Sequence, residues 1–215
     1  NTQMKHRYWD VRNRIKTAQG ELYLTVPVSK KIHRDNRMFC NSEVNYEELW
    51  ADKHIKSIAN NYRKSPFFEE VIDLVVTCFN KRPRYLSDLN IEIIDAIKDN
   101  IGITTKTIKS SSLLGISGKK DERLVDICNK LSIGAYLSPI GSSDYINEIS
   151  LGGEFIKHGL KLSYQNYEHP VYQQNYGKFL SHMSIIDLLF NCGFESSLEI
   201  IRSGRRKNIA YDNIN

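Results

Sequence analysis

The side chains best suited to chemistry gather between Tyr164 and Gly193, directly before and within an apolar helix pattern. Ring hydroxyls, amides and imidazoles make up this set, which comprises Tyr164, Tyr167, His169, Tyr172, Gln173, Gln174, Tyr176 and His182. Such groups form directional hydrogen bonds and offer ring faces, which suits a polyhydroxylated or heteroaromatic ligand. We therefore expect a polar small-molecule site here, although the residues by themselves name no reaction.

Within that segment, we interpret His169 as the catalytic residue and Tyr172 and Gln174 as substrate-binding residues. A histidine can take or give a proton near neutral pH, and Pro170 would hold it in a stiff segment. A purely structural bond between His169 and the backbone is the alternative. A hydrolase triad of His182, Ser184 and Asp187 is disfavoured, because Ser184 is better explained as a helix cap and Asp187 as its third helical residue.

Two other stretches carry groups that could grip an anionic or aromatic ligand. Trp9, Arg12, Asn13 and Arg14 place an indole beside two guanidinium groups, a combination that suits a base or sugar and its phosphate. On the helix predicted over 45–63, His54 and Asn61 are seven residues apart and share a face, with Tyr62 adjacent. A half-exposed strand and a mixed polar surface helix are the alternatives.

The second half of the chain adds candidate ligand contacts after a Gly/Ser loop and after a strand. Arg123 follows a helix start, where free N–H groups favour an anion. Ser138, Gly141, Asp144 and Tyr145 follow an apolar strand, and glycine there permits close approach of the backbone to a ligand. An internally capped helix and an ordinary strand-to-helix turn explain the same residues equally well.

The elements that must position these residues follow from hydrophobic periodicity and turn residues. Strand structure is expected over 4–28, with a turn at 18–20, and a short β-rich segment over 104–110. Further strands are expected at 135–140 and 160–164. Helices are expected at 45–63, 67–79, 86–100, 121–131, 184–191 and 195–203, with Asn45 and either Ser87 or Asp88 as caps and Gly193 as a helix end.

This order predicts an α/β fold with a mostly parallel sheet flanked by helices. A helical lobe over 45–100 is inserted between the early and late strands of a single domain over 1–203, and 204–215 forms a polar tail. The 215 residues suffice for one such domain.

Composition narrows the class of protein. Hydrophobic residues make up 40% and charged residues 26%, a globular profile, and the net charge of +5 is spread along the chain. The four cysteines show no zinc or disulfide spacing, and Cys78, Cys128 and Cys192 look like core thiols. We expect no metal site, no membrane span and a cytoplasmic location. RNA binding is disfavoured because no RNP-like, KH or zinc-knuckle signature is present. No cofactor is assigned.

Four blocks of the sequence resemble a known family, in the order that the family shows. They read RNRIKTAQGELYLTVPV, HIKSIANNYRKSPFFEE, ERLVDICNKLSIGAYLSPIGSSDYI and HPVYQQNYGKFLSHMSIIDLLFNCG. They are similar to successive blocks of the WbqC-like family and span nearly the whole chain. The family also shows a His-x-Pro-like motif that would precede this sequence, with Gln3 at the end of the family's second strand, and a histidine of that motif is a further expected catalytic residue.

The resemblance implies a role among the bacterial genes for surface polysaccharides such as the O-antigen of lipopolysaccharide. An enzyme that transfers an acyl or aminoacyl group to an amino-sugar nucleotide is the leading hypothesis, with Arg12, Arg14 and Arg123 on phosphate. Its partners would be the nucleotide-linked sugar and the acyl or aminoacyl donor. A non-catalytic ligand-binding or scaffolding component of the same pathway is the alternative.

Overall fold

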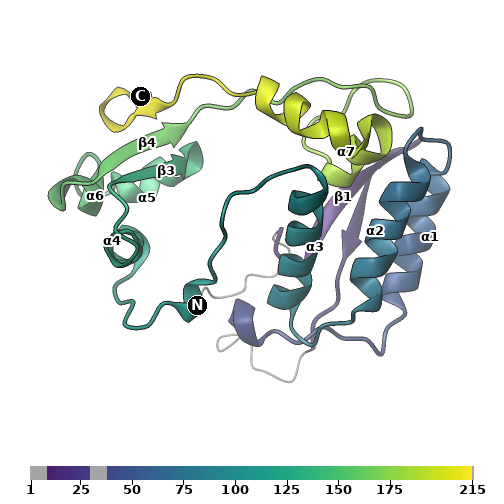
Figure 1. Ribbon diagram of the computed structural model, residues 1–215, viewed down its shortest axis with the longest axis horizontal. Helices are drawn as coiled ribbons and strands as arrows, with labels where there is room; N and C mark the ends of the chain where they lie inside the picture. Colours follow the sequence, from purple (N-terminus) through teal and green to yellow (C-terminus); the bar gives the residue numbers. More distant parts are fainter. Residues whose placement is uncertain (1–8, 30–37, 215) are drawn as a thin grey trace. The chain divides into compact units, whose positions relative to one another are not determined.

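The computed structural model describes residues 9–29 and 38–214 (Figure 1). Its strands are β1 Arg12–Thr17, β2 Gly20–Thr25, β3 Ala135–Pro139, β4 Lys161–Gln165 and β5 Ile209–Ala210. Its α-helices are α1 Trp50–Tyr62, α2 Phe68–Asn80, α3 Leu86–Asn100, α4 Lys120–Lys130, α5 Ser143–Ile146, α6 Gly153–Lys157 and α7 Ile185–Ser203. Within these described ranges, every helix is too short or too polar to traverse a bilayer.

The contacts divide the chain into two compact units. The first comprises Asn1–Thr105 and His169–Ser203, and the second comprises Lys106–Glu168 and Gly204–Asn215. The region 45–100, predicted as a helical lobe, lies within the first unit. The single domain over 1–203 stays a prediction, as does the proposed role of Gln3, which lies outside the described residues.

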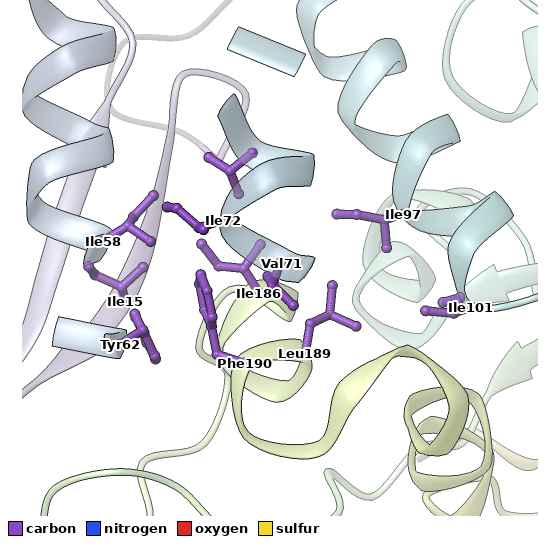
Figure 2. Packing of buried hydrophobic residues seen from close by; sticks show 11 residues of the cluster. Ile15, Ile58, Tyr62, Val71, Ile72, Ile97, Ile101, Ile186, Leu189 and Phe190 are labelled. Atoms are coloured by element: carbon purple, nitrogen blue, oxygen red, sulfur yellow. The ribbon is translucent and has the colours of Figure 1, made fainter. Parts of the chain in front are cut away.

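The described part of the first unit is built on a β-hairpin and the helices α1, α2, α3 and α7. β1 pairs with β2 in antiparallel register, with Ile15 opposite Leu22, and Gly20 takes a positive φ of 113° at the turn. Helices α1 and α7 pack against β1, α2 packs against both of these helices, and α3 packs against α2. Figure 2 shows the core between them, in which Tyr62 of α1 and Phe190 of α7 stack at 4.5 Å between ring centroids.

Apolar periodicity accounts for α2 and α3, which begin within one residue of the predicted positions. The predicted helix over 45–63 is wrong at its start, because α1 begins at Trp50. Asn45 accepts a hydrogen bond from the Glu47 backbone N–H at 3.1 Å and donates to the Glu48 side chain, so it closes a local turn instead. The caps predicted for α3 are wrong too, since Tyr85 occupies the cap position without a side-chain bond.

The break predicted at Gly193 is present inside α7. Gly193 adopts φ 75° and ψ 173°, a conformation that only glycine adopts easily. A Cβ atom at this position would lie 2.7 Å from the Phe67 ring. Glycine is therefore required both by the backbone and by the close approach of the aromatic ring.

The second unit is a small mixed sheet with helices. β3 and β4 are parallel, with Ser138 opposite Tyr164, and α5 and α6 form the crossover between them. β5 pairs antiparallel with β4, so the stretch predicted as a polar tail contributes a strand. The buried side chains of α4, α6 and β4 form this unit's core, which includes Phe155, fully buried. The strand predicted over 104–110 is wrong, because this stretch is irregular and ends in a 3₁₀ turn.

The α/β class is confirmed, and its sheets are small. Among the strands of the described residues, β3–β4 is parallel, whereas β1–β2 and β4–β5 are antiparallel. The predicted mostly parallel sheet therefore gives way to a separate hairpin and a three-stranded mixed sheet. Strand–helix–strand order alone could not reveal that, within 9–29 and 38–214, β1 and β2 form a two-stranded sheet of their own.

Candidate functional site

A cavity of about 310 Å³ lies in the first unit between the hairpin and the helices, and we call it the hairpin cavity. Its floor is apolar and comes from β1, β2, α1, α2, α3 and α7. Its polar or aromatic lining residues are Trp9, Asp10, Arg12, Asn13, His54, Asn90 and Ser184. A concave, mostly apolar surface with a few polar groups is the usual form of a small-molecule site, and this volume is at the small end of the usual range.

His54 reaches the hairpin cavity from α1. Its ring lies 5.2 Å from the Trp50 ring and 6.3 Å from the Phe79 ring, between centroids. Burial among these rings lowers the pKa of His54 to about 4, and a hydrogen bond with the Thr25 backbone offsets only part of this effect. The imidazole is therefore neutral at pH 7 and keeps one nitrogen lone pair for a ligand.

The two arginines of β1 differ in their partners. Arg14 forms an ion pair with Glu21 at 2.9 Å and donates to the His182 carbonyl at 2.9 Å. Arg12 lines the cavity, lies over the Tyr23 ring at 4.6 Å, and has a buried Nε without a hydrogen-bond partner in the described structure. A half-buried guanidinium without a carboxylate is costly unless an anion completes it. Arg12 is thus the better placed of the two to hold an anion.

Two aromatic rings stand beside the two guanidinium groups of β1. Trp9 and Tyr23 lie 6.2 Å apart between ring centroids, and they are 58% and 42% exposed. Trp9 also lines the cavity, and the Arg14 guanidinium lies 5.3 Å from its centre. Exposed ring faces beside a cavity offer a stacking surface for a sugar or a base.

A second group of polar residues, which we call the Asp187 cluster, is buried behind β1. Asp187 is 0% exposed and accepts hydrogen bonds from the Tyr62 hydroxyl at 2.6 Å, the Tyr172 hydroxyl at 2.9 Å and Gln174 Nε2 at 2.7 Å. Burial and then the adjacent Asp187 carboxylate raise the pKa of both tyrosines, so that both remain donors at pH 7. The cluster therefore fastens the irregular chain around Tyr172 and Gln174 to α1 and α7.

Lys16 extends the Asp187 cluster. Its side chain is 2% exposed, and its Nζ donates to the Lys178 carbonyl at 2.7 Å, while its backbone N–H donates to the Tyr62 hydroxyl at 3.0 Å. Burial lowers the pKa of Lys16, although the Asp187 charge acts in the opposite direction. The sequence alone gave no indication that this lysine is buried.

His169 is engaged by the backbone through both ring nitrogens. Its Nδ1 lies 2.9 Å from the Pro170 carbonyl, and its Nε2 accepts a hydrogen bond from the His182 N–H at 3.2 Å. This arrangement fits a neutral ring protonated on Nδ1. A catalytic role for His169 stays a prediction, which requires one of these backbone partners to be exchanged for substrate.

The other predicted site residues occupy varied positions. Asn61 donates to the Ser57 carbonyl within α1. Arg123, Ser138, Gly141, Asp144 and Tyr145 lie in the second unit, where Ser138 is 1% exposed and its hydroxyl has no hydrogen-bond partner in the described structure. The structure thus brings Trp9, Arg12, Asn13 and His54 together at the hairpin cavity and Tyr62, Tyr172 and Gln174 together at Asp187.

Some residues of these two sites were missed by sequence reasoning. Asp10, Tyr23, Asn90 and Lys16 carried no recognisable spacing signal. Asp187 did carry one, because a carboxylate inside the run IIDLLF must face partners once the helix is buried. Across residues 9–29 and 38–214, no group of three or more His, Cys, Asp or Glu side chains is arranged to hold a metal ion.

Comparisons with known proteins place the chain in a family. The pattern of the family described as "WbqC-like protein family" matches residues 1–199. A protein of Mycobacterium tuberculosis that bears the name "Uncharacterized protein Rv1507c" is 31% identical over 196 residues, covering 90% of this chain and 82% of that relative. No solved structure matches the chain. The chain therefore belongs to the WbqC-like protein family.

Proposed function

We propose that this WbqC-like protein is an enzyme of surface-polysaccharide precursor assembly that transfers an acyl or aminoacyl group to an amino-sugar nucleotide. The observation that carries the proposal is the hairpin cavity, which has a mostly apolar lining that also includes Arg12, Trp9 and His54. An apolar floor suits the transferred group, whereas a guanidinium and an exposed indole suit the phosphate and ring of a nucleotide-linked sugar. A cytoplasmic location and the donor remain predictions.

The reaction would form one bond and break one. The amine nitrogen of the sugar bonds to the carbonyl carbon of an activated donor, such as a thioester, and the bond from that carbon to the leaving group breaks. The proton lost by the amine passes to a base, and the leaving group takes up a proton. His169 is the predicted proton acceptor. His54 lines the cavity and is neutral at pH 7, but its low pKa makes it a weak base, so we assign it to ligand binding.

The test is a ligand-binding and turnover assay on the whole chain. Thermal shift against amino-sugar nucleotides should show a selective rise in Tm, and mass spectrometry should detect the acylated sugar when a donor is added. Arg12→Ala should weaken binding of the phosphate-bearing ligand about tenfold or more, because a charge-assisted contact is lost. Arg63→Ala is the matched control, since Arg63 is exposed at the end of α1. Equal affinities of the two variants would contradict the proposal.

A non-catalytic binding role is the second candidate function. It is favoured by His169, whose two ring nitrogens already have backbone partners. If the role is non-catalytic, the same ligands bind and Arg12→Ala lowers the affinity for them, but no acylated sugar accumulates with any donor. The turnover measurement therefore separates the two candidates.

A further inference from the structure

Among the described residues, Arg12 has unpaired backbone groups on the edge of β1 that faces away from β2, and it lines the hairpin cavity. The Val26 N–H donates to the Val11 carbonyl at 2.7 Å, and β1 and β2 are in continuous antiparallel register. In such a ladder the bonded pairs alternate, so Asn13 and Ile15 also bond to β2. The N–H and C=O groups of Arg12, Arg14 and Lys16 therefore point away from β2, along the other edge.

Neighbours of Arg12 on this edge already have partners. The Asp10 carbonyl accepts from Asn90 Nδ2 at 3.0 Å, and the Arg14 carbonyl accepts from the Ser184 N–H at 2.8 Å. The Arg14 N–H donates to Asn13 Oδ1 at 2.8 Å. Within the described residues, Arg12 keeps both its N–H and its C=O without a partner, between two occupied positions and at the wall of the cavity. Unpaired backbone groups on a strand edge are ready to pair with an extended ligand.

We infer that the backbone N–H and C=O of Arg12 bind an α-aminoacyl group, in the way that one strand residue binds its partner in a sheet. In an antiparallel pair, the N–H and C=O of one residue bond to the C=O and N–H that flank a single Cα of its partner. An α-aminoacyl group carries that same arrangement, a nitrogen donor and a carbonyl acceptor on either side of one carbon. A simple acyl group offers the acceptor alone.

The charges of the cavity fit this ligand. An α-aminoacyl group bears an ammonium at pH 7, and Asp10 is the acidic residue among those that line the cavity. The Arg12 guanidinium lies over Tyr23, on the face of the hairpin rather than in its edge, where it is available for a phosphate. The inference rests on the proposed function, because it selects an aminoacyl group among the groups that the cavity could receive.

The first test is amide hydrogen exchange, followed residue by residue by NMR. In the free protein the Arg12 amide should exchange about tenfold or more faster than the amides of Asn13 and Ile15, which are bonded to β2. The probes are N-glycyl-glucosamine, N-glycolyl-glucosamine and N-acetyl-glucosamine, which differ only in the group beside the carbonyl. The glycyl probe should protect the Arg12 amide and bind about fivefold more tightly than the acetyl probe.

A pair of variants isolates the backbone donor from the side chain. Arg12→Ala removes the guanidinium and keeps the N–H, whereas Arg12→Pro removes both, and proline is tolerated where a strand N–H faces away from the sheet. Arg12→Pro should bind the glycyl probe about fivefold more weakly than Arg12→Ala, with circular dichroism showing that both are folded. If proline unfolds the protein, the exchange experiment on the unmodified chain decides.

Three results would overturn the inference: an Arg12 amide protected in the free protein, equal affinity for the three probes, or failure of the glycyl probe to bind at millimolar concentration. Failure of the proposed function looks different. If the glycyl probe binds selectively and protects the Arg12 amide but no group is transferred to any amino sugar, the proposed transferase function is wrong and the binding site at Arg12 stands. If the protein transfers a simple acyl group and the Arg12 amide is not protected, the transferase function stands and the binding site at Arg12 is wrong.

Discussion

Replacing Asp187 by asparagine should destabilise the first unit by about 3 kcal/mol. Two carboxylate oxygens accept three hydrogen bonds, and the amide of asparagine can serve only one of the two sides. If its oxygen faces Tyr172 and Gln174, the Tyr62 hydroxyl loses an acceptor worth about 1.5–3 kcal/mol, and the two remaining bonds lose their charge assistance. Relief of the buried charge offsets part of the loss.

The assay is urea unfolding followed by tryptophan fluorescence. Both tryptophans, Trp9 and Trp50, belong to the first unit, so the signal reports on the unit that contains Asp187. In a separate thermal unfolding experiment, a loss of about 3 kcal/mol would lower the Tm by about 6–12 °C for a chain of this size. Asp73→Asn is the control, since Asp73 is exposed on α2, and it should change stability by less than about 0.5 kcal/mol.

A double-mutant cycle with Tyr62→Phe then tests the cause. If the Tyr62 hydroxyl bond to Asp187 is responsible, the two substitutions together should cost clearly less than the sum of their separate effects. The reasoning fails if Asp187→Asn costs less than about 1 kcal/mol, or if the two effects simply add.

Two further predictions concern pH and backbone strain. The pKa of His54 is about 4 in the folded state and near 6.5 in the unfolded state, so between these pH values the unfolded state binds one more proton. The free energy of unfolding should therefore fall by up to about 3 kcal/mol as the pH drops from 6.5 to 4. NMR titration should give the folded pKa, and His54→Gln should remove this part of the pH dependence whereas His158→Gln, at an exposed histidine, should not. Gly193→Ala should cost about 2–4 kcal/mol in urea unfolding, from its positive φ and the contact with Phe67, whereas Gly141→Ala, with open space around it, should be nearly neutral.

The helices of the first unit could be predicted from the sequence because their apolar residues recur on one face. The start of α1 could not, since Asn45 and Glu48 have the spacing of a capping box and use it for a turn that precedes the helix. The positions of β1 to β4 were predicted closely, but their partners were not. Pairing depends on contacts distant in sequence, such as β5 with β4, and two strand residues carry almost no signal of their own.

The candidate site shows the same limit at the level of single residues. Arg12 and Arg14 have the same type, the same strand and the same face, so the sequence treats them alike. Glu21 pairs with Arg14 because the hairpin register puts Lys16 opposite Glu21 and Tyr23 opposite Arg14, which leaves Arg12 with an aromatic ring instead of a carboxylate. The register of the hairpin thus decides which arginine is left to hold an anion.

The two candidate histidines, His169 and His54, differ in whether both of their ring nitrogens already have partners within the described part of the protein. His169 lies in the segment richest in polar rings, and both its nitrogens hold the backbone in place. His54, on an ordinary amphipathic helix, lines the cavity with a pKa that keeps it neutral. Polar side chains that lie close together form hydrogen bonds with one another and so have little left to offer a ligand. We therefore expect a binding site where a polar group beside a cavity lacks a partner within the protein. By that criterion the Asp187 cluster is structural, and the edge of β1 at Arg12 is where substrate should be sought.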